Sequence, residues 1–365
     1  MSYRYKVIAA ALLSLSTLVP AGFASAADLP VKVKAKPVPD IPFFLVIDDR
    51  VTYSWMPKGT DPGAFSVRPG GGIDGTTAKS VYSFTHFDVW AYGTNFFTIS
   101  LYKSDHNDPA GPCSNAGVLL SGAPANCAGA SEVYGLIRST FGWNEIFGTK
   151  AFTMGPLHNI SFEVGADGET ENSFLAPAKR DFVAGLQFAF DLPYKGYINV
   201  APLAYKEINH NAFDQCGLFG PGIPGVTCIA DGNTDFKTTW ALEMNYYMDL
   251  NFLPESMQYF AISGRVGFYG PKGNQNEPLG VLGGGTATKT EINSEPIRLT
   301  FDASKAIWGK KYSQFVTTWV AYRYWQNKFG LDHNAAPGVC TLNNGTVSTN
   351  SCTESTVYAG VTVKF

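Results

Sequence analysis

Apolar and polar residues alternate along much of this chain with a period of two. In residues 180–191, Phe182, Leu186 and Phe188 occupy one set of positions, and small or polar residues occupy the positions between them. The pattern repeats in four further stretches, at residues 240–248, 258–269, 297–303 and 357–365. Because successive side chains of a β-strand point to opposite faces of the sheet, this alternation predicts strands with one apolar and one polar face.

The alternating segments predict twelve strands, at residues 45–56, 79–91, 95–104, 131–142, 157–168, 180–191, 196–207, 236–248, 258–270, 292–304, 313–326 and 355–365. The gaps after odd-numbered strands are long, whereas even-numbered strands are followed by short turns. An even strand count with short turns on one side and long loops on the other is typical of outer-membrane barrels. The sequence therefore predicts an all-β protein, a transmembrane antiparallel β-barrel with short periplasmic turns and long extracellular loops. We expect it in the bacterial cell outer membrane.

A secreted, soluble β-sandwich is the alternative fold, because its strands also alternate, with the apolar face turned inward. Composition favours the barrel. Aromatic residues make up 14% of the chain, and charged residues only 16%, below the usual share of about 25%. Aromatic residues gather near predicted strand ends, as at Trp55, Trp90 and Trp240, where membrane barrels carry interfacial girdles.

Residues 1–26 predict a secretory signal peptide. Arg4 and Lys6 precede an apolar run of about 13 residues, too short to span a bilayer, and small residues with Ala-x-Ala spacing follow it. Residues 27–42 are rich in Pro and Lys and have no apolar period, so we expect a flexible N-terminal segment. The outer-membrane β-barrel domain is expected at residues 43–365.

Six cysteines agree with an exported protein. They form three local pairs in long predicted loops, namely Cys113 with Cys127, Cys216 with Cys228, and Cys340 with Cys352. Sequence alone does not determine the connectivity, and pairing of nearest neighbours is favoured because each pair brackets one loop. A disulfide that closes a loop of this size stabilises by roughly 3 kcal/mol in the chain-entropy model. No C-x-x-C spacing occurs, so we expect no metal site.

If the apolar face of each strand meets lipid, the other face lines the lumen. By this parity, the expected lining residues are Tyr82, Phe84, Asp88, Arg138, Glu163, Asp167, Glu243, Arg265, Arg298 and Arg323. Charges of both signs can line a narrow channel, or they can pair and brace a closed barrel, and both interpretations stay open. Twelve strands lie between filled eight-stranded barrels and wide porins, which favours a narrow channel. We expect a constriction at Glu243 and Arg265, with Tyr82 and Phe84 as a stacking surface.

Residues 86–97 (HFDVWAYGTNFF) resemble the second-hairpin motif of the nucleoside-specific channel-forming, Tsx-like, outer-membrane protein family. Residues 132–135 and 191–199 also resemble that family. The resemblance implies a monomeric twelve-stranded barrel that passes nucleosides down a narrow lumen lined by aromatic and charged side chains. The cysteine-bracketed loops are not part of the family pattern.

We therefore expect a channel for passive uptake of small polar solutes such as nucleosides, surrounded by outer-membrane lipid and lipopolysaccharide. A general small-solute porin and a surface attachment or phage-receptor barrel stay open as alternatives. The formal net charge is −3, without a basic excess, so we expect no nucleic-acid partner. A G-x-S-x-G motif is absent from the sequence, which disfavours an outer-membrane hydrolase. We expect no enzymatic activity and no cofactor.

Overall fold

The computed structural model describes residues 42–67, 72–105, 108, 129–172, 178–209, 234–273, 289–336, 338–343 and 345–365. The predicted signal peptide and most of the N-terminal segment lie outside these residues and stay predictions. The predicted pairs Cys113 with Cys127 and Cys216 with Cys228 also lie outside them. Cys340 and Cys352 form a disulfide, which confirms the third predicted pair.

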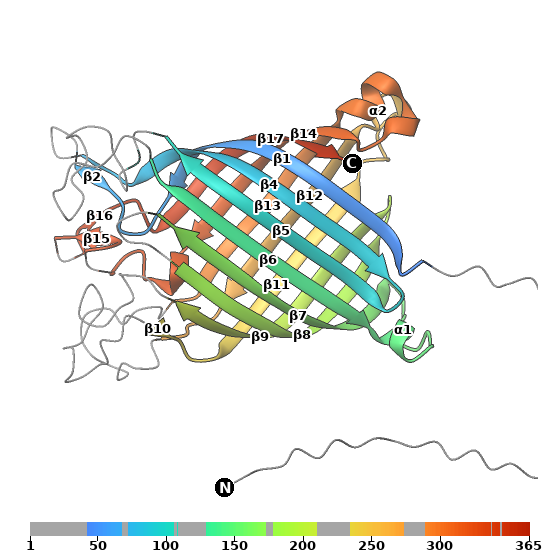
Figure 1. Cartoon of the computed structure of the whole chain (residues 1–365), viewed down its shortest axis with the longest axis horizontal. Coiled ribbons are helices and arrows are strands. Elements are labelled where there is room, and N and C mark those ends of the chain that lie inside the picture. The colour runs from blue at the N-terminus through green and yellow to red at the C-terminus, as the bar shows by residue number, and fades with distance from the viewer. Residues whose placement is uncertain are drawn as a thin grey trace, which may run out of the picture. The chain divides into compact units, whose positions relative to one another are not determined.

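Within the described residues, twelve long antiparallel strands pair edge to edge in a closed ring (Figure 1). The ring closes because β1 pairs with both β4 and β17, and β8 pairs with β9. The strands are β1 (Phe44–Thr60), β4 (Thr76–Trp90), β5 (Gly93–Ser104), β6 (Ser131–Gly142), β7 (Leu157–Glu171), β8 (Ala178–Leu192), β9 (Gly196–Asn209), β11 (Thr239–Asp249), β12 (Phe260–Tyr269), β13 (Glu291–Asp302), β14 (Val316–Gln326) and β17 (Thr353–Lys364). The predicted fold class and strand count are confirmed.

The two ends of the barrel differ. Short turns at one end carry α1 (Trp143–Ile146), α2 (Ala303–Trp308), η1 (Glu255–Met257) and η2 (Lys310–Tyr312). The connections at the other end carry η3 (Lys328–Gly330) and the two-residue strands β2 (Ser66–Val67), β3 (Ile73–Asp74), β10 (Thr234–Asp235), β15 (Thr341–Leu342) and β16 (Val347–Ser348). Figure 1 shows α1, α2 and the C-terminus at the end opposite to β2, β15 and β16. No helix in the described part of the chain is long and apolar enough to cross a membrane.

Side chains alternate between the two faces of the barrel wall. Outward positions are apolar and exposed, since Val51 is 50% exposed, Phe182 56% and Val357 58%. Inward positions carry charged residues that are almost completely buried, such as Asp181 and Glu207. A soluble β-sandwich has the opposite arrangement, because its apolar residues pack inward. An apolar outer face around a polar interior is the arrangement of an outer-membrane barrel, and the predicted location in the outer membrane is confirmed.

Candidate functional site

A charged cluster centred on Arg138 of β6 spans the lumen. Nε and Nη2 of Arg138 donate hydrogen bonds to Oε2 and Oε1 of Glu243 on β11, at 3.0 and 2.7 Å. Nη1 of Arg138 also pairs with Asp167 on the adjacent strand β7. Three strands, β7, β8 and β9, separate β6 from β11 around the ring. The pair between Arg138 and Glu243 therefore joins two walls that the hydrogen bonds of the sheet do not connect directly.

Two tyrosines complete the hydrogen bonding of these carboxylates. The hydroxyl of Tyr134 donates to Oδ2 of Asp167 at 2.9 Å, and that of Tyr269 donates to Oε1 of Glu243 at 3.0 Å. A carboxylate that leaves bulk water needs several donors to offset its desolvation. The cluster supplies these donors from two strands, Arg138 and Tyr134 from β6 and Tyr269 from β12.

A glycine makes room for the Arg138 side chain. A Cβ atom on Gly165 of β7 would lie 2.5 Å from Cδ of Arg138, so only a glycine lets the arginine lie against this strand. Glu163, two residues earlier, accepts a hydrogen bond from Nε2 of Gln187 at 2.8 Å and lies 3.9 Å from Nε of Arg138. The local sequence of β7 therefore places two carboxylates on either side of the space that the arginine fills.

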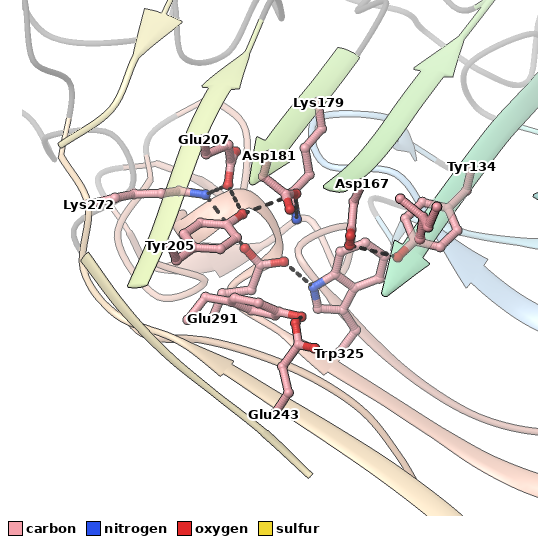
Figure 2. Close-up of polar contacts among 12 residues, drawn as sticks. Tyr134, Asp167, Lys179, Asp181, Tyr205, Glu207, Glu243, Lys272, Glu291 and Trp325 are labelled. Atoms are coloured by element: carbon pink, nitrogen blue, oxygen red, sulfur yellow. Dashed lines mark hydrogen bonds and ion pairs between the residues drawn. The ribbon is translucent and has the colours of Figure 1, made fainter. Parts of the chain in front are cut away.

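Figure 2 shows a second charged group, which lies where β9 ends and β13 begins, at the end of the barrel with the long connections. Lys272 pairs with Glu207 of β9, and its Nζ lies 3.7 Å from Oε2 of Glu291 on β13. Trp325 donates a hydrogen bond from Nε1 to Oε1 of Glu291 at 2.7 Å, and Tyr205 donates its hydroxyl to Glu207. Lys272 follows β12 and Glu207 lies on β9, so their pair joins parts of the wall that β11 separates.

A third charged group joins the strands near the ends of the chain. Nζ of Lys79 on β4 lies 2.7 Å from Oδ1 of Asp61 and 3.0 Å from Oε2 of Glu132 on β6. Arg323 of β14 donates from Nε to Oε1 of Glu354 on β17 at 3.0 Å. All five side chains are nearly buried, so these contacts brace the wall at its long-loop end.

Arg298 of β13 is also fully engaged. Its Nε and Nη2 donate to the two carboxylate oxygens of Glu295 at 2.7 and 3.1 Å. Its guanidinium carbon lies 3.9 Å from the ring centroid of Trp319, in a cation–π contact. Such a two-point contact holds the guanidinium against the wall rather than in the open lumen.

Arg265 of β12 differs from the other lumen arginines. It is exposed, and it forms neither a hydrogen bond nor an ion pair with any residue that the structure describes. Together with Tyr102, Glu169 and Asn293 it lines a cavity of about 30 Å³, enough space for roughly one water molecule. Glu169 likewise has no such partner among the described residues, and the buried Oδ1 of Asn293 has no hydrogen-bond partner there. An arginine, a glutamate and an amide oxygen without partners in the described residues therefore line the same cavity.

The structure places the predicted charged residues beyond β4 on the inner face, namely Arg138, Glu163, Asp167, Glu243, Arg265, Arg298 and Arg323. It brings four of them, Arg138, Glu163, Asp167 and Glu243, into one cluster. The predicted constriction between Glu243 and Arg265 takes a different form, because Glu243 pairs with Arg138 and Arg265 points into the cavity. Their role in solute passage stays a prediction.

The predicted inner face of β4 is wrong. Lys79 reaches Glu132 across the intervening strand β5, so the odd positions of β4 face the lumen, and the even positions Tyr82, Phe84 and Asp88 face outward. Tyr82 is 51% exposed. The prediction failed because a polar cluster lies on the outer face of β4 near the short turn. Its polar residues made the outward positions of β4 look like positions that face the lumen.

In that outer cluster, Nδ1 of His86 lies 2.7 Å from Oδ1 of Asp49 on β1, and its Nε2 lies 3.1 Å from Oδ2 of Asp88. Asn95 of β5 donates from Nδ2 to Oδ1 of Asp88 at 2.9 Å. These contacts keep Asp88 almost fully buried although it faces away from the lumen. His86 and Asp88, on even positions of β4, thus lie on the outer side of the wall.

The sequence interpretation missed the aromatic residues that do line the cavity, Tyr102, Tyr134 and Trp325. A signal for Tyr102 was present, because residues 95–104 alternate between apolar positions and a polar set that includes Thr98 and Ser100. Tyr102 belongs to that polar set and therefore to the inner face.

Several solved outer-membrane proteins resemble the barrel distantly. The β domain of the Bordetella autotransporter BrkA matches with a TM-score of 0.36 and 6% identity, over 87% of this chain and 99% of that chain. The toluene transporter TodX of P. putida has a TM-score of 0.32 and 9% identity, over 87% and 89%. An anion-selective porin from Comamonas acidovorans has a TM-score of 0.28 and 9% identity, over 87% and 98%. No family model and no curated protein matches the chain.

At these scores the likeness carries no argument about what this barrel transports or binds. The chain is an outer-membrane β-barrel by its own architecture, through its closed ring and its apolar outer face. Membership of the Tsx-like family stays a prediction that rests on residues 86–97.

Proposed function

We propose that the protein is an outer-membrane channel for the passive uptake of small polar solutes, nucleosides in particular. The observation that carries the proposal is the open position of Arg265, which is exposed and unpaired among the described residues while Arg138, Arg298 and Arg323 are all paired. A charge that braces a barrel has a partner of opposite sign, as the buried Arg138 and Arg323 have, whereas Arg265 stays exposed on the inner face without one in the described residues. An unpaired cation that shares a cavity with the unpaired Glu169 is suited to a passing polar solute.

The chemistry of the cavity supports a solute with a ring and hydroxyl groups. Tyr102, Tyr134 and Trp325 offer aromatic surfaces, and stacking of a nucleobase on such a ring contributes about 1–3 kcal/mol. Arg265 and Glu169 offer a donor and an acceptor for ribose hydroxyls. The cavity holds about one water molecule, so passage requires the long Arg265 side chain to swing aside. Weak and reversible binding of this kind is what conduction needs.

A second candidate function, a closed barrel that presents its loops at the cell surface, has one observation in its favour. The contact between Arg138 and Glu243 crosses the lumen and fills it with paired charge. Charges of both signs brace small closed barrels in this way. The two candidates differ in a single property, which is whether ions cross the refolded protein.

The deciding experiment is conductance of the refolded protein in planar bilayers, with and without added nucleosides. We expect discrete current steps in salt alone and a dose-dependent reduction of the current by nucleosides. Arg265→Ala should raise the single-channel conductance by widening the cavity, and Tyr102→Ala should weaken the nucleoside block by about tenfold or more. Phe84→Ala is the matched aromatic control on the outer face and should change neither quantity.

The possible outcomes separate the candidates. If the unaltered protein gives no current steps, the closed barrel is correct and the channel is rejected. If steps occur but nucleosides at millimolar concentration leave the current unchanged, the protein is a general small-solute porin. If Tyr102→Ala and Phe84→Ala weaken the block equally, the cavity is not the site at which nucleosides bind.

A further inference from the structure

A further group of charged side chains lies at the short-turn end of the barrel, where two cations share one carboxylate. Arg50 of β1 donates from Nε and Nη2 to Oδ1 and Oδ2 of Asp48, at 2.6 and 2.9 Å. Nζ of Lys364, the last residue of β17, donates to Oδ2 of the same carboxylate at 2.8 Å. The side chains of Arg50 and Lys364 are 38% and 36% exposed, so this group has one positive charge in excess and is open to solvent.

These three side chains belong to the inner face of the wall. Arg50 lies opposite Thr85, on one of the odd positions of β4 that face the lumen, and opposite Lys364 on its other side. Residues directly opposite each other in neighbouring strands share a face of the sheet, and so do residues two positions apart in one strand, as Asp48 and Arg50 are. The open cations therefore face the lumen and not the lipid.

Two tyrosines occupy the inner face of β9 and β11 at the same end of the barrel. Tyr197, near the start of β9, lies opposite Tyr247, near the end of β11, and their rings stack with centroids 6.1 Å apart. Tyr247 lies four positions after the inward-facing Glu243, so both rings are on the lumen side. Tyr197 is 43% exposed, which leaves one face of the stacked pair accessible to a solute.

The aromatic pair is held in position by hydrogen bonds to one of its rings. The hydroxyl of Tyr247 donates to Oδ1 of Asp249 at 2.6 Å and accepts from Nε2 of Gln314 at 3.2 Å. Gln314 lies in the turn between β13 and β14, and β12 separates β13 from β11, so this turn reaches across a strand to the ring. A ring that is fixed before a solute arrives lowers the ordering cost of binding.

The cationic wall and the aromatic wall face each other across the lumen. Five strands separate β1 from β9 in either direction around the ring. The guanidinium of Arg50 nevertheless interacts electrostatically with the hydroxyl groups of Tyr247 and Tyr197. These residues are not among those that line the cavity at Arg265. The short-turn end of the lumen is therefore a separate site, with open cations on one wall and an open ring on the other.

We propose that this site binds solutes in which a ring is joined to an oxyanion, such as a nucleoside monophosphate or an aromatic carboxylate. The oxyanion lies on Arg50 and Lys364, because guanidinium and ammonium groups are strong donors to phosphate and carboxylate oxygens. The ring lies against Tyr197. Asp48 competes with the solute for both cations, so binding stays weak enough for release. The inference rests on the proposed function in that solutes enter the lumen, and it adds an anionic class to the uncharged nucleosides.

The test measures binding to the folded, detergent-solubilised protein by isothermal titration calorimetry, so it does not depend on ion current. The probes are adenosine 5′-monophosphate, benzoate and, as the uncharged reference, adenosine. Arg50→Gln and Tyr197→Leu should each weaken binding of the monophosphate by about tenfold. Lys195→Gln and Tyr194→Leu are the matched controls in the turn before β9, where Tyr194 is 44% exposed, and neither should change the affinity. Gel mobility without heating verifies that each variant is folded.

Asp48→Asn should have the opposite effect, because it removes the carboxylate that competes for the two cations. Binding of the monophosphate should tighten by about threefold, and binding of adenosine should not change. Whichever anion loses affinity in Arg50→Gln identifies the oxyanion that the site takes. If the protein binds that anion but gives no current steps in planar bilayers, the channel is rejected and this site stands.

Two results would overturn the proposal. One is that Arg50→Gln binds both anions as tightly as Lys195→Gln does. The other is that Asp48→Asn, verified as folded, binds them no more tightly than the unaltered protein.

Discussion

Replacement of Arg138 by methionine tests whether the charge network across the lumen holds the barrel together. The change removes one guanidinium and leaves Asp167 and Glu243 without the cation that pairs with both of them. The side chain of Arg138 is 9% exposed and that of Asp167 is 4% exposed, so water compensates poorly for the lost contacts. Methionine fills similar space, so the loss should report charge pairing and not a cavity.

The expected loss of unfolding free energy in Arg138→Met follows from the hydrogen bonds that the two carboxylates keep. Removal of one partner from a buried ion pair costs about 3–5 kcal/mol. Asp167 keeps the hydrogen bond from Tyr134, and Glu243 keeps that from Tyr269, so we expect a loss near the lower limit, about 3 kcal/mol. In the double variant Arg138→Met with Glu243→Met, one of the stranded carboxylates is gone. The double variant should therefore lose less unfolding free energy than the two single variants lose when their losses are added.

The assay is urea unfolding of the refolded protein in lipid vesicles, followed by tryptophan fluorescence and by gel mobility without heating. The unfolding free energy of Arg138→Met is compared with that of Arg138→Lys, which keeps a charge but cannot bond both oxygens of Glu243 and should lose less. A loss below about 1 kcal/mol for Arg138→Met would refute the reasoning, because it would mean that lumen water solvates the stranded carboxylates.

Three further predictions concern the wall and the loops. Phe188→Arg on the lipid face should lower the free energy of unfolding by about 2–4 kcal/mol, and Gln187→Arg on the lumen face should lower it much less. Equal losses of unfolding free energy in a urea titration would contradict the assigned faces. Gly165→Ala should displace Arg138 and cost about 1–3 kcal/mol, whereas Gly168→Ala on the same strand has 3.9 Å of clearance and should be tolerated in the same titration. Cys340 and Cys352 are almost fully buried in the closed loop, so once reduction lets the loop open, both should react with a membrane-impermeant thiol reagent on intact cells. Labelling only from the periplasmic side would contradict the loop orientation.

Much of the barrel follows from local sequence. The alternation that places Phe188 opposite Gln187, or Leu299 opposite Arg298, is a property of neighbouring residues, and each strand shows it without its partners. Loop lengths are also local, and with the strand count they indicate an outer-membrane barrel. The inward position of Arg138 and Glu243 was predictable because the outward positions around them are apolar.

The face of β4 was decided only by the tertiary structure. Its even positions carry Tyr82 and His86, and its odd positions carry Ser83 and Thr85, so neither face is clearly apolar. His86 faces outward because Asp49, on the strand beside it in the ring, supplies its partner, and that pairing joins residues 37 positions apart.

By itself, then, the sequence determined which segments are strands, that they form a membrane barrel, and which face of most strands is polar, since these depend on patterns within a few residues. Only the tertiary structure decided which charges neutralise one another across the lumen. Arg138 and Glu243 lie 105 positions apart, and their contact depends on the closure of the ring. The same closure leaves Arg265 without a partner in the described residues, because the nearby carboxylates Glu243 and Glu295 are taken by Arg138 and Arg298.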